Sequence, residues 1–138
     1  MLTMTFEKIL RWITIAGIFA LPFIPFYVSG SLFFPYITGK NFAFRIIVEI
    51  ITGAWIALAL VYPKYSHYRP RAPWILGAFA MFVFVVAVAN ANGVHPFKSF
   101  WSNYERMDGW ITLAHVFLYT VVAAAMLQTE NLWRRLFQ

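Results

Sequence analysis

The sequence contains no cysteine and few charged residues. The absence of cysteine excludes a disulfide framework and any site that depends on a thiolate. Charged residues make up 12% of the 138 residues, whereas a typical soluble domain has roughly 25%. So few charged residues provide too little polar surface to cover a water-soluble globule. Since 62% of the residues are hydrophobic and 20% are aromatic, the composition predicts an integral membrane protein.

Four apolar segments approach or reach the roughly 20 residues that a membrane-spanning helix needs. They cover residues 9–28, 41–62, 74–90 and 109–127. We therefore expect an all-α fold with four transmembrane helices that form a single region over residues 1–138. Pro22 and Pro25 should kink the second half of the first helix, because proline removes a backbone donor. The first segment also has features of a signal peptide, but its apolar run is longer than the usual core of about 7–15 residues.

The basic residues between these segments predict the orientation. The side that bears both termini holds seven: Lys8, Arg11, Lys64, Arg69, Arg71, Arg134 and Arg135. The other side holds four: Lys40, Arg45, Lys98 and Arg106. Because Lys and Arg are retained in the cytoplasm, both termini should be cytoplasmic. The net charge of +6 is dispersed in short clusters, so we expect no nucleic-acid partner.

The second apolar segment carries a polar stripe at helical spacing, formed by Asn41, Arg45, Glu49 and Thr52. An unpaired charge at the centre of a lipid-facing helix costs about 2.5–3.5 kcal/mol on insertion scales. We therefore predict a structural ion pair between Arg45 and Glu49. Two other interpretations stay open: Arg45 binds an anion in an outward cavity with Glu49 orienting it, or Arg45 extends to the outer headgroups.

The fourth segment carries a matching stripe, formed by Asp108, Thr112, His115 and Tyr119. His115 is expected to be a packed, hydrogen-bonded residue, with a proton-handling role as the alternative. No other histidine or carboxylate has metal-ligand spacing with it. We therefore predict no metal and no cofactor.

The loop before the fourth segment has an aromatic stripe at helical spacing. Its members are Phe97, Phe100, Trp101, Tyr104 and Met107. This pattern predicts a short interfacial helix over residues 97–107. A capping-box pattern from Ser102 to Glu105 offers an alternative start for the fourth helix. Lys98 and Arg106 are candidates for attracting an anionic headgroup.

Three strings in this order carry a resemblance to a known family. They are SLFFPYITGKNFAFRIIVE, YRPR before the third segment, and NGVHPFKSFWSNYERMDGWITLAH. Together they resemble the amino-terminal part of the O-antigen ligase and O-antigen polymerase-like proteins. The resemblance implies a multi-pass glycosyltransferase of the bacterial inner membrane. Such enzymes transfer or polymerise glycan from an undecaprenyl-diphosphate carrier at the periplasmic face, without a metal.

Family members have many more spans, and their catalytic histidine and arginines lie later in the chain. The resemblance therefore implies an amino-terminal fragment that is inactive alone, whose partners are the bilayer, a lipid-linked diphosphate glycan and the remaining helices. No catalytic residue is carried over. Arg45, Lys98 and Arg106 are the predicted substrate-binding residues. The alternative is a self-sufficient four-span protein without enzymatic activity, such as an assembly partner or a small transporter.

Overall fold

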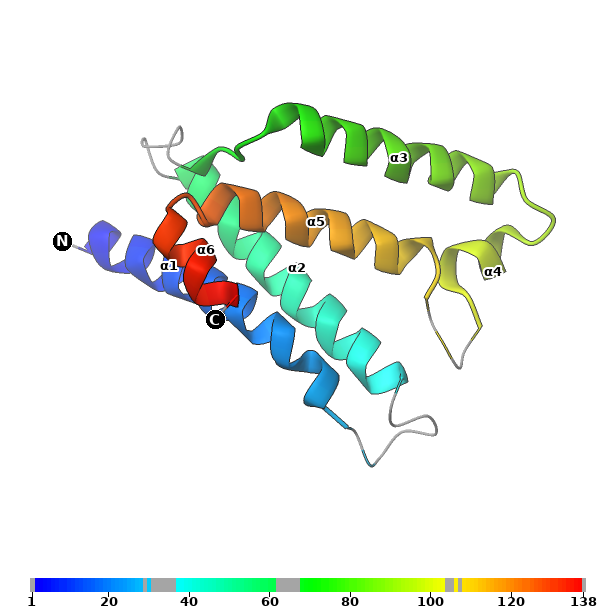
Figure 1. The fold of residues 1–138 in the computed structure, drawn as a ribbon, viewed down its shortest axis with the longest axis horizontal. Helices are drawn as coiled ribbons and strands as arrows, with labels where there is room; N and C mark the ends of the chain where they lie inside the picture. Colours follow the sequence, from blue (N-terminus) through cyan, green and yellow to red (C-terminus); the bar gives the residue numbers. More distant parts are fainter. Residues whose placement is uncertain are drawn as a thin grey trace.

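The chain is all-helical in the part that the structure describes (Figure 1). This computed structural model describes residues 2–28, 30, 37–61, 68–103, 106 and 108–137. The helices are α1 (Leu2–Ala20), η1 (Leu21–Phe26), α2 (Thr38–Val61), α3 (Pro73–Ala91), α4 (Pro96–Trp101), α5 (Trp110–Met126) and α6 (Glu130–Phe137). The predicted all-α class is confirmed.

Three segments are long and apolar enough to cross a membrane: Phe6–Phe26, Thr38–Val61 and Pro73–Ala91. The helix α5 is also apolar, but with 17 residues it is shorter than these three segments. Length and composition therefore support three of the four predicted crossings. The crossing by α5 stays a prediction.

The prolines of the first segment change the type of helix. The α-helix α1 ends at Ala20, and the chain continues to Phe26 as the 3₁₀ helix η1, which contains Pro22 and Pro25. Proline has no N–H group to donate to the carbonyl four residues earlier, so it interrupts the α-helical pattern. The Tyr27 N–H group donates to the Ile24 carbonyl at 2.9 Å, which ends η1 in a tight turn.

The four apolar helices alternate in direction, and both termini lie at the same end of the molecule (Figure 1). The helix α2 packs against α1 and α5, and α3 packs against α5. Fully buried side chains come from three of these helices, including Ile18, Ile51 and Val122. In contrast, α3 buries only Val83. The core is therefore formed by α1, α2 and α5, and α3 presents most of its surface outward.

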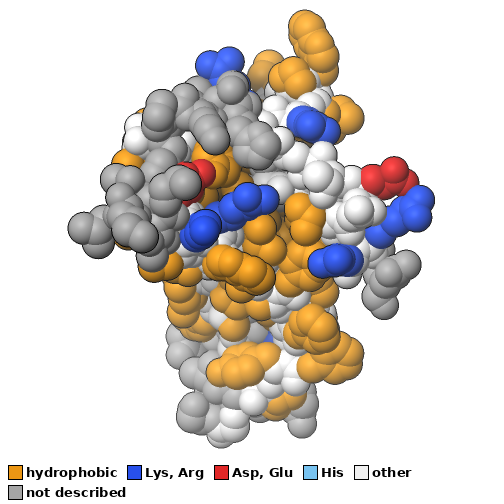
Figure 2. Space-filling model, turned by 90° about the vertical axis from the view of Figure 1, so that its left-hand side faces the viewer, with side chains coloured by type: hydrophobic (Ala, Val, Ile, Leu, Met, Phe, Trp, Pro, Cys, Tyr) orange, Lys and Arg blue, Asp and Glu red, His pale blue; other side chains and the backbone are white. Residues whose placement is uncertain are grey.

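Hydrogen bonds hold the end that bears the termini together. The buried Tyr68 hydroxyl donates to Glu7 Oε1 at 2.7 Å. Trp55 Nε1 donates to the Tyr68 carbonyl at 3.0 Å, and Arg71 Nη1 donates to the Gln128 carbonyl at 2.9 Å. Lys and Arg side chains gather around this end (Figure 2). Of the seven basic residues assigned to one side from the sequence, only Lys64 lies outside the described residues.

The loop helix is shorter than predicted. The helix α4 ends at Trp101, because Ser102 has a φ of 64° and leaves the helical conformation. The prediction of a helix over residues 97–107 is therefore wrong beyond Trp101, although Tyr104 and Met107 lie outside the described residues. The capping-box alternative is also wrong, because α5 begins at Trp110 after an extended Gly109. A side chain at Gly109 would collide with the Phe100 carbonyl, so glycine permits the chain to fold back here.

Candidate functional site

The two polar stripes predicted from the sequence lie face to face along α2 and α5. The first contact joins the start of α2 to the segment before α5. Asn41 Nδ2 donates to Asp108 Oδ1 at 2.8 Å and to the Arg106 carbonyl at 2.6 Å. A single amide group therefore fixes the main chain that leads into α5.

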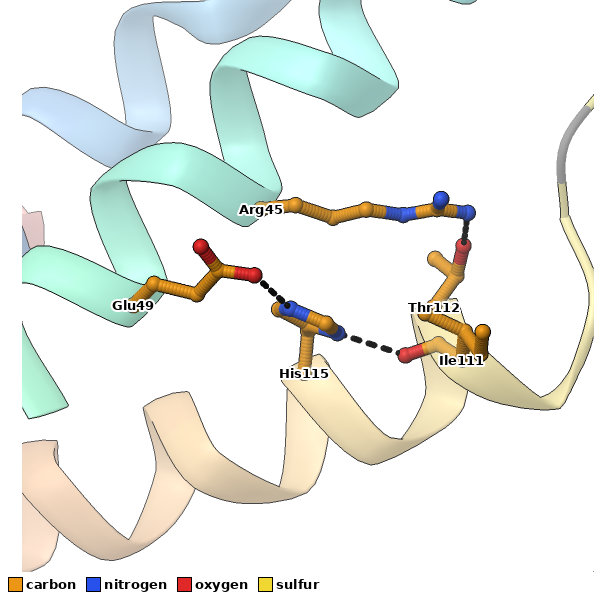
Figure 3. Close-up of polar contacts among 5 residues, drawn as sticks. All are labelled: Arg45, Glu49, Ile111, Thr112 and His115. Carbon is orange, nitrogen blue, oxygen red and sulfur yellow. Dashed lines mark hydrogen bonds and ion pairs between the residues drawn. The ribbon is translucent and has the colours of Figure 1, made fainter.

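The second contact is made by Arg45, one turn further along α2. Its guanidinium Nη2 donates to Thr112 Oγ1 at 2.7 Å (Figure 3). Arg45 is only 6% exposed, so it points into the protein and does not extend to the surface. Asp108 and Glu49 also attract this guanidinium electrostatically. A charge that is buried away from water is usually hydrogen-bonded and lies near opposite charges, and Arg45 has both a hydrogen-bond acceptor and nearby carboxylates.

The third contact joins Glu49 to His115 on α5. Glu49 Oε1 lies 3.3 Å from His115 Nε2, and His115 Nδ1 lies 2.7 Å from the Ile111 carbonyl (Figure 3). A carbonyl only accepts, so Nδ1 carries a proton. A hydrogen bond between Nε2 and Glu49 Oε1 needs a proton on one of these two atoms. This contact therefore joins α2 to α5 one turn beyond Arg45.

These contacts follow one register, which we call the polar ladder: Asn41–Asp108, Arg45–Thr112 and Glu49–His115. The partners are separated by 67, 67 and 66 residues. A nearly constant separation means that α2 and α5 run in the same direction, as Figure 1 shows. Thr52, the last member of the α2 stripe, is 9% exposed, and within the described chain its hydroxyl has no hydrogen-bond partner.

The two residues predicted to form an ion pair, Arg45 and Glu49, each have a partner on α5. Figure 3 shows that Arg45 points toward Thr112, whereas Glu49 points toward His115. The stripe itself faces α5 and the segment that leads into it. The direct ion pair stays a prediction, which the electrostatic attraction between the two residues leaves open.

The three predicted substrate-binding residues lie near the end of the molecule opposite the termini. Lys98, in α4, and Arg106 are both exposed, whereas Arg45 is buried between α2 and α5. Lys98 lines a hollow of about 460 Å³ with the segment from Val94 to Phe97. The three residues therefore form two groups: two surface cations in the α3–α5 connection and one buried cation in the polar ladder.

The sequence interpretation missed the amphipathic character of α6. Its apolar residues Leu132 and Leu136 pack against the core, whereas Glu130 and Arg134 form an exposed i,i+4 ion pair at 2.8 Å. The segment ENLWRRLF has leucines four residues apart, which is the spacing of one helical face. Its two arginines were interpreted only as markers of orientation. Among the described residues, no group of three histidines or acidic residues is placed to hold a metal.

Comparison with known proteins adds no relative. No protein-family model, curated protein or solved structure matches the chain.

Proposed function

We propose that this chain is the amino-terminal membrane part of an O-antigen ligase-like glycosyltransferase. In this proposal α1, α2, α3 and α5 cross the bacterial inner membrane, with both termini in the cytoplasm. The polar ladder then lies in the periplasmic half of the bilayer. The part of the function that belongs to these residues is to help hold an undecaprenyl-diphosphate-linked glycan, and catalysis needs further residues.

The observation that carries the proposal is the anchoring of Arg106 on α2. Asn41 binds the Arg106 carbonyl at 2.6 Å, while the Arg106 side chain stays exposed. This hydrogen bond ties the main chain at Arg106 to α2, and the proposal puts this point at the membrane boundary. Lys98 adds a second exposed cation in the same connection. Paired phosphates are recognised by cations near the membrane surface, where the local dielectric constant is lower than in water.

Arg45 has a different part in this proposal. It is buried, and its hydrogen bond to Thr112 positions α5 against α2. Its charge adds to the positive potential at this end of the molecule, while Lys98 and Arg106 contact the phosphates directly. A fixed arrangement of donors favours binding because little reorganisation is needed when the ligand arrives.

The test is direct binding of undecaprenyl diphosphate to the full chain in lipid nanodiscs. Lys98→Gln and Arg106→Gln should each weaken binding by about fivefold, since one basic group near a membrane surface contributes that much toward an anion. Raising the salt concentration should weaken binding to the parent chain more than binding to either variant.

Arg134→Gln is the matched control, because it removes an exposed arginine at the opposite end of the molecule. It should leave binding unchanged. Equal affinities for the parent, Lys98→Gln and Arg106→Gln would reject the proposed role of these cations. Absence of binding by every form would favour the self-sufficient membrane protein without enzymatic activity.

A further inference from the structure

A groove lies between α1 and α6, near the end that bears the termini. It has a volume of about 710 Å³, which falls within the roughly 300–1,000 Å³ typical of small-molecule sites. One wall is a single face of α1, because Lys8, Arg11, Ile15 and Phe19 follow helical spacing. The other wall comes from Leu132 and Arg135 of α6.

The two ends of this groove differ in polarity. Lys8 and Arg11 lie in the part of α1 nearest the amino terminus, whereas Ile15 and Phe19 lie deeper along the same face. Lys8 and Phe19 are separated by about 16 Å along the helix axis at 1.5 Å per residue. Trp12 stands between the two parts and is 72% exposed. The groove is therefore cationic at one end and apolar along its length.

Among the described residues, no carboxylate forms an ion pair with the cations of the groove. Glu7 accepts the hydrogen bond of Tyr68, and Glu130 pairs with Arg134. Within the described chain, no ion pair is found for Lys8, Arg11 or Arg135. Three like charges around one groove repel one another unless an anion lies between them. The charge and the shape of the groove therefore both favour an anionic ligand with an apolar part.

We infer that this groove binds an anionic phospholipid. Its phosphate lies among Lys8, Arg11 and Arg135, and one acyl chain follows Trp12, Ile15 and Phe19 toward the bilayer centre. The amphipathic helix α6 suits this position, because its apolar residues pack inward and Arg135 faces the headgroup. The site lies away from the polar ladder and does not depend on the proposed glycan donor.

The experiment measures quenching of Trp12 by lipids that carry bromine on their acyl chains. The full chain is placed in vesicles of equal parts phosphatidylglycerol and phosphatidylcholine, with one or the other brominated. Brominated phosphatidylglycerol should quench the Trp12 signal more strongly, and Trp12→Phe should remove that difference. Arg11→Gln or Arg135→Gln should reduce the preference for the anionic lipid by up to about fivefold.

Arg134→Gln is again the matched control, because Arg134 adjoins Arg135 but pairs with Glu130 outside the groove. It should keep the full preference. Equal quenching by both lipids in the parent chain would overturn the inference. An equal loss in Arg134→Gln and Arg135→Gln would also overturn it, because the preference would then come from diffuse surface charge. If neither lipid quenches Trp12, protein such as a second copy of the chain covers the groove, and the inference is also overturned.

Discussion

The polar ladder near one end of this helical bundle and the groove near the other end use charged residues in opposite ways. Along the polar ladder, Arg45 and Glu49 each contact a polar group on α5, and Asn41 binds Asp108. Around the groove between α1 and α6, Lys8, Arg11 and Arg135 meet no carboxylate among the described residues. Charged residues that contact polar groups on a neighbouring helix help to set how the helices pair. Charges left at its edge are available to a ligand.

The difference follows from the cost of removing charge from water. An isolated buried ion is unfavourable, so it persists only with hydrogen bonds or opposite charges around it. Arg45 donates a hydrogen bond to Thr112, and Asp108 and Glu49 attract its charge. The cations near the termini are exposed and pay little of this cost, so the fold does not need to neutralise them. Counting the charged residues and their signs therefore does not distinguish a structural cation from a cation that binds a ligand.

The largest expected effect tests whether these two ends lie on opposite sides of a membrane. The chain has no native cysteine, so Val94→Cys and Asn131→Cys each introduce a single reactive thiol. Val94 is 91% exposed, and Asn131 is also exposed. In intact cells an impermeant thiol reagent should label position 94 and leave position 131 unlabelled until the membrane is opened. Because α5 lies between these positions, equal labelling of both would show that α5 does not cross.

The next effect concerns the buried cation of the ladder. Arg45→Met should lower the free energy of unfolding by about 2 kcal/mol, because it removes a charge-assisted hydrogen bond to Thr112. It also removes the electrostatic attraction between Arg45 and Asp108. Reversible unfolding in bicelles measures this change. Ile46→Met is the control, because Ile46 is the next residue and is 53% exposed; it should stay within about 0.5 kcal/mol of the parent. Similar losses for both variants would contradict a special role for Arg45.

The ladder shows which parts of this fold can be predicted from sequence. Helical spacing placed Asn41, Arg45 and Glu49 on one face of a helix, and it placed Thr112 and His115 on one face of another. Periodicity does not specify which two faces meet, because that depends on the packing of the whole bundle. The same spacing is compatible with an ion pair between Arg45 and Glu49 within α2. In the structure each of the two residues contacts a partner on α5.

The loop before α5 shows a different limit. Its aromatic spacing fits a helix over residues 97–107, but the backbone turns away at Ser102. The turn brings Gly109 against the Phe100 carbonyl, a contact between backbone groups that side-chain patterns do not encode. The groove could not be predicted either, because it requires α6 to pack beside a helix more than a hundred residues earlier.

A smaller effect is expected where α1 meets α2. A side chain at Gly17 would collide with the methyl group of Ile51, which is fully buried. Gly17→Ala should therefore destabilise the chain by about 1 kcal/mol, since overpacking outweighs the gain in helix propensity. Gly77→Ala is the matched control on α3, where nothing lies within 4 Å of the added carbon. That variant should be neutral or slightly stabilising, so a loss as large as that of Gly17→Ala would reject close packing as the cause.

The smallest effect is expected at Glu49, whose side chain is 67% exposed. Glu49→Gln should change the free energy of unfolding by less than about 0.5 kcal/mol, as for most exposed ion pairs. The glutamine amide can still donate to His115 Nε2 while Nδ1 donates to the Ile111 carbonyl, so the ladder contact survives. The measurement is the same unfolding experiment, with Glu49→Leu as the control that removes the hydrogen bond.

Combining Glu49→Gln with Arg45→Met then decides how Arg45 is neutralised. If His115 is the main partner of Glu49, the two changes in free energy should add, because Arg45→Met removes the contact with Thr112 and Glu49→Gln leaves a separate contact with His115 in place. If Arg45 and Glu49 form the ion pair predicted from their spacing, the double variant should lose less than the sum of the single variants, since removing one charge already breaks the pair. A loss for Glu49→Gln as large as that for Arg45→Met would point to the same conclusion. The direct pair would then hold the charges in place, with the contacts to α5 secondary to it.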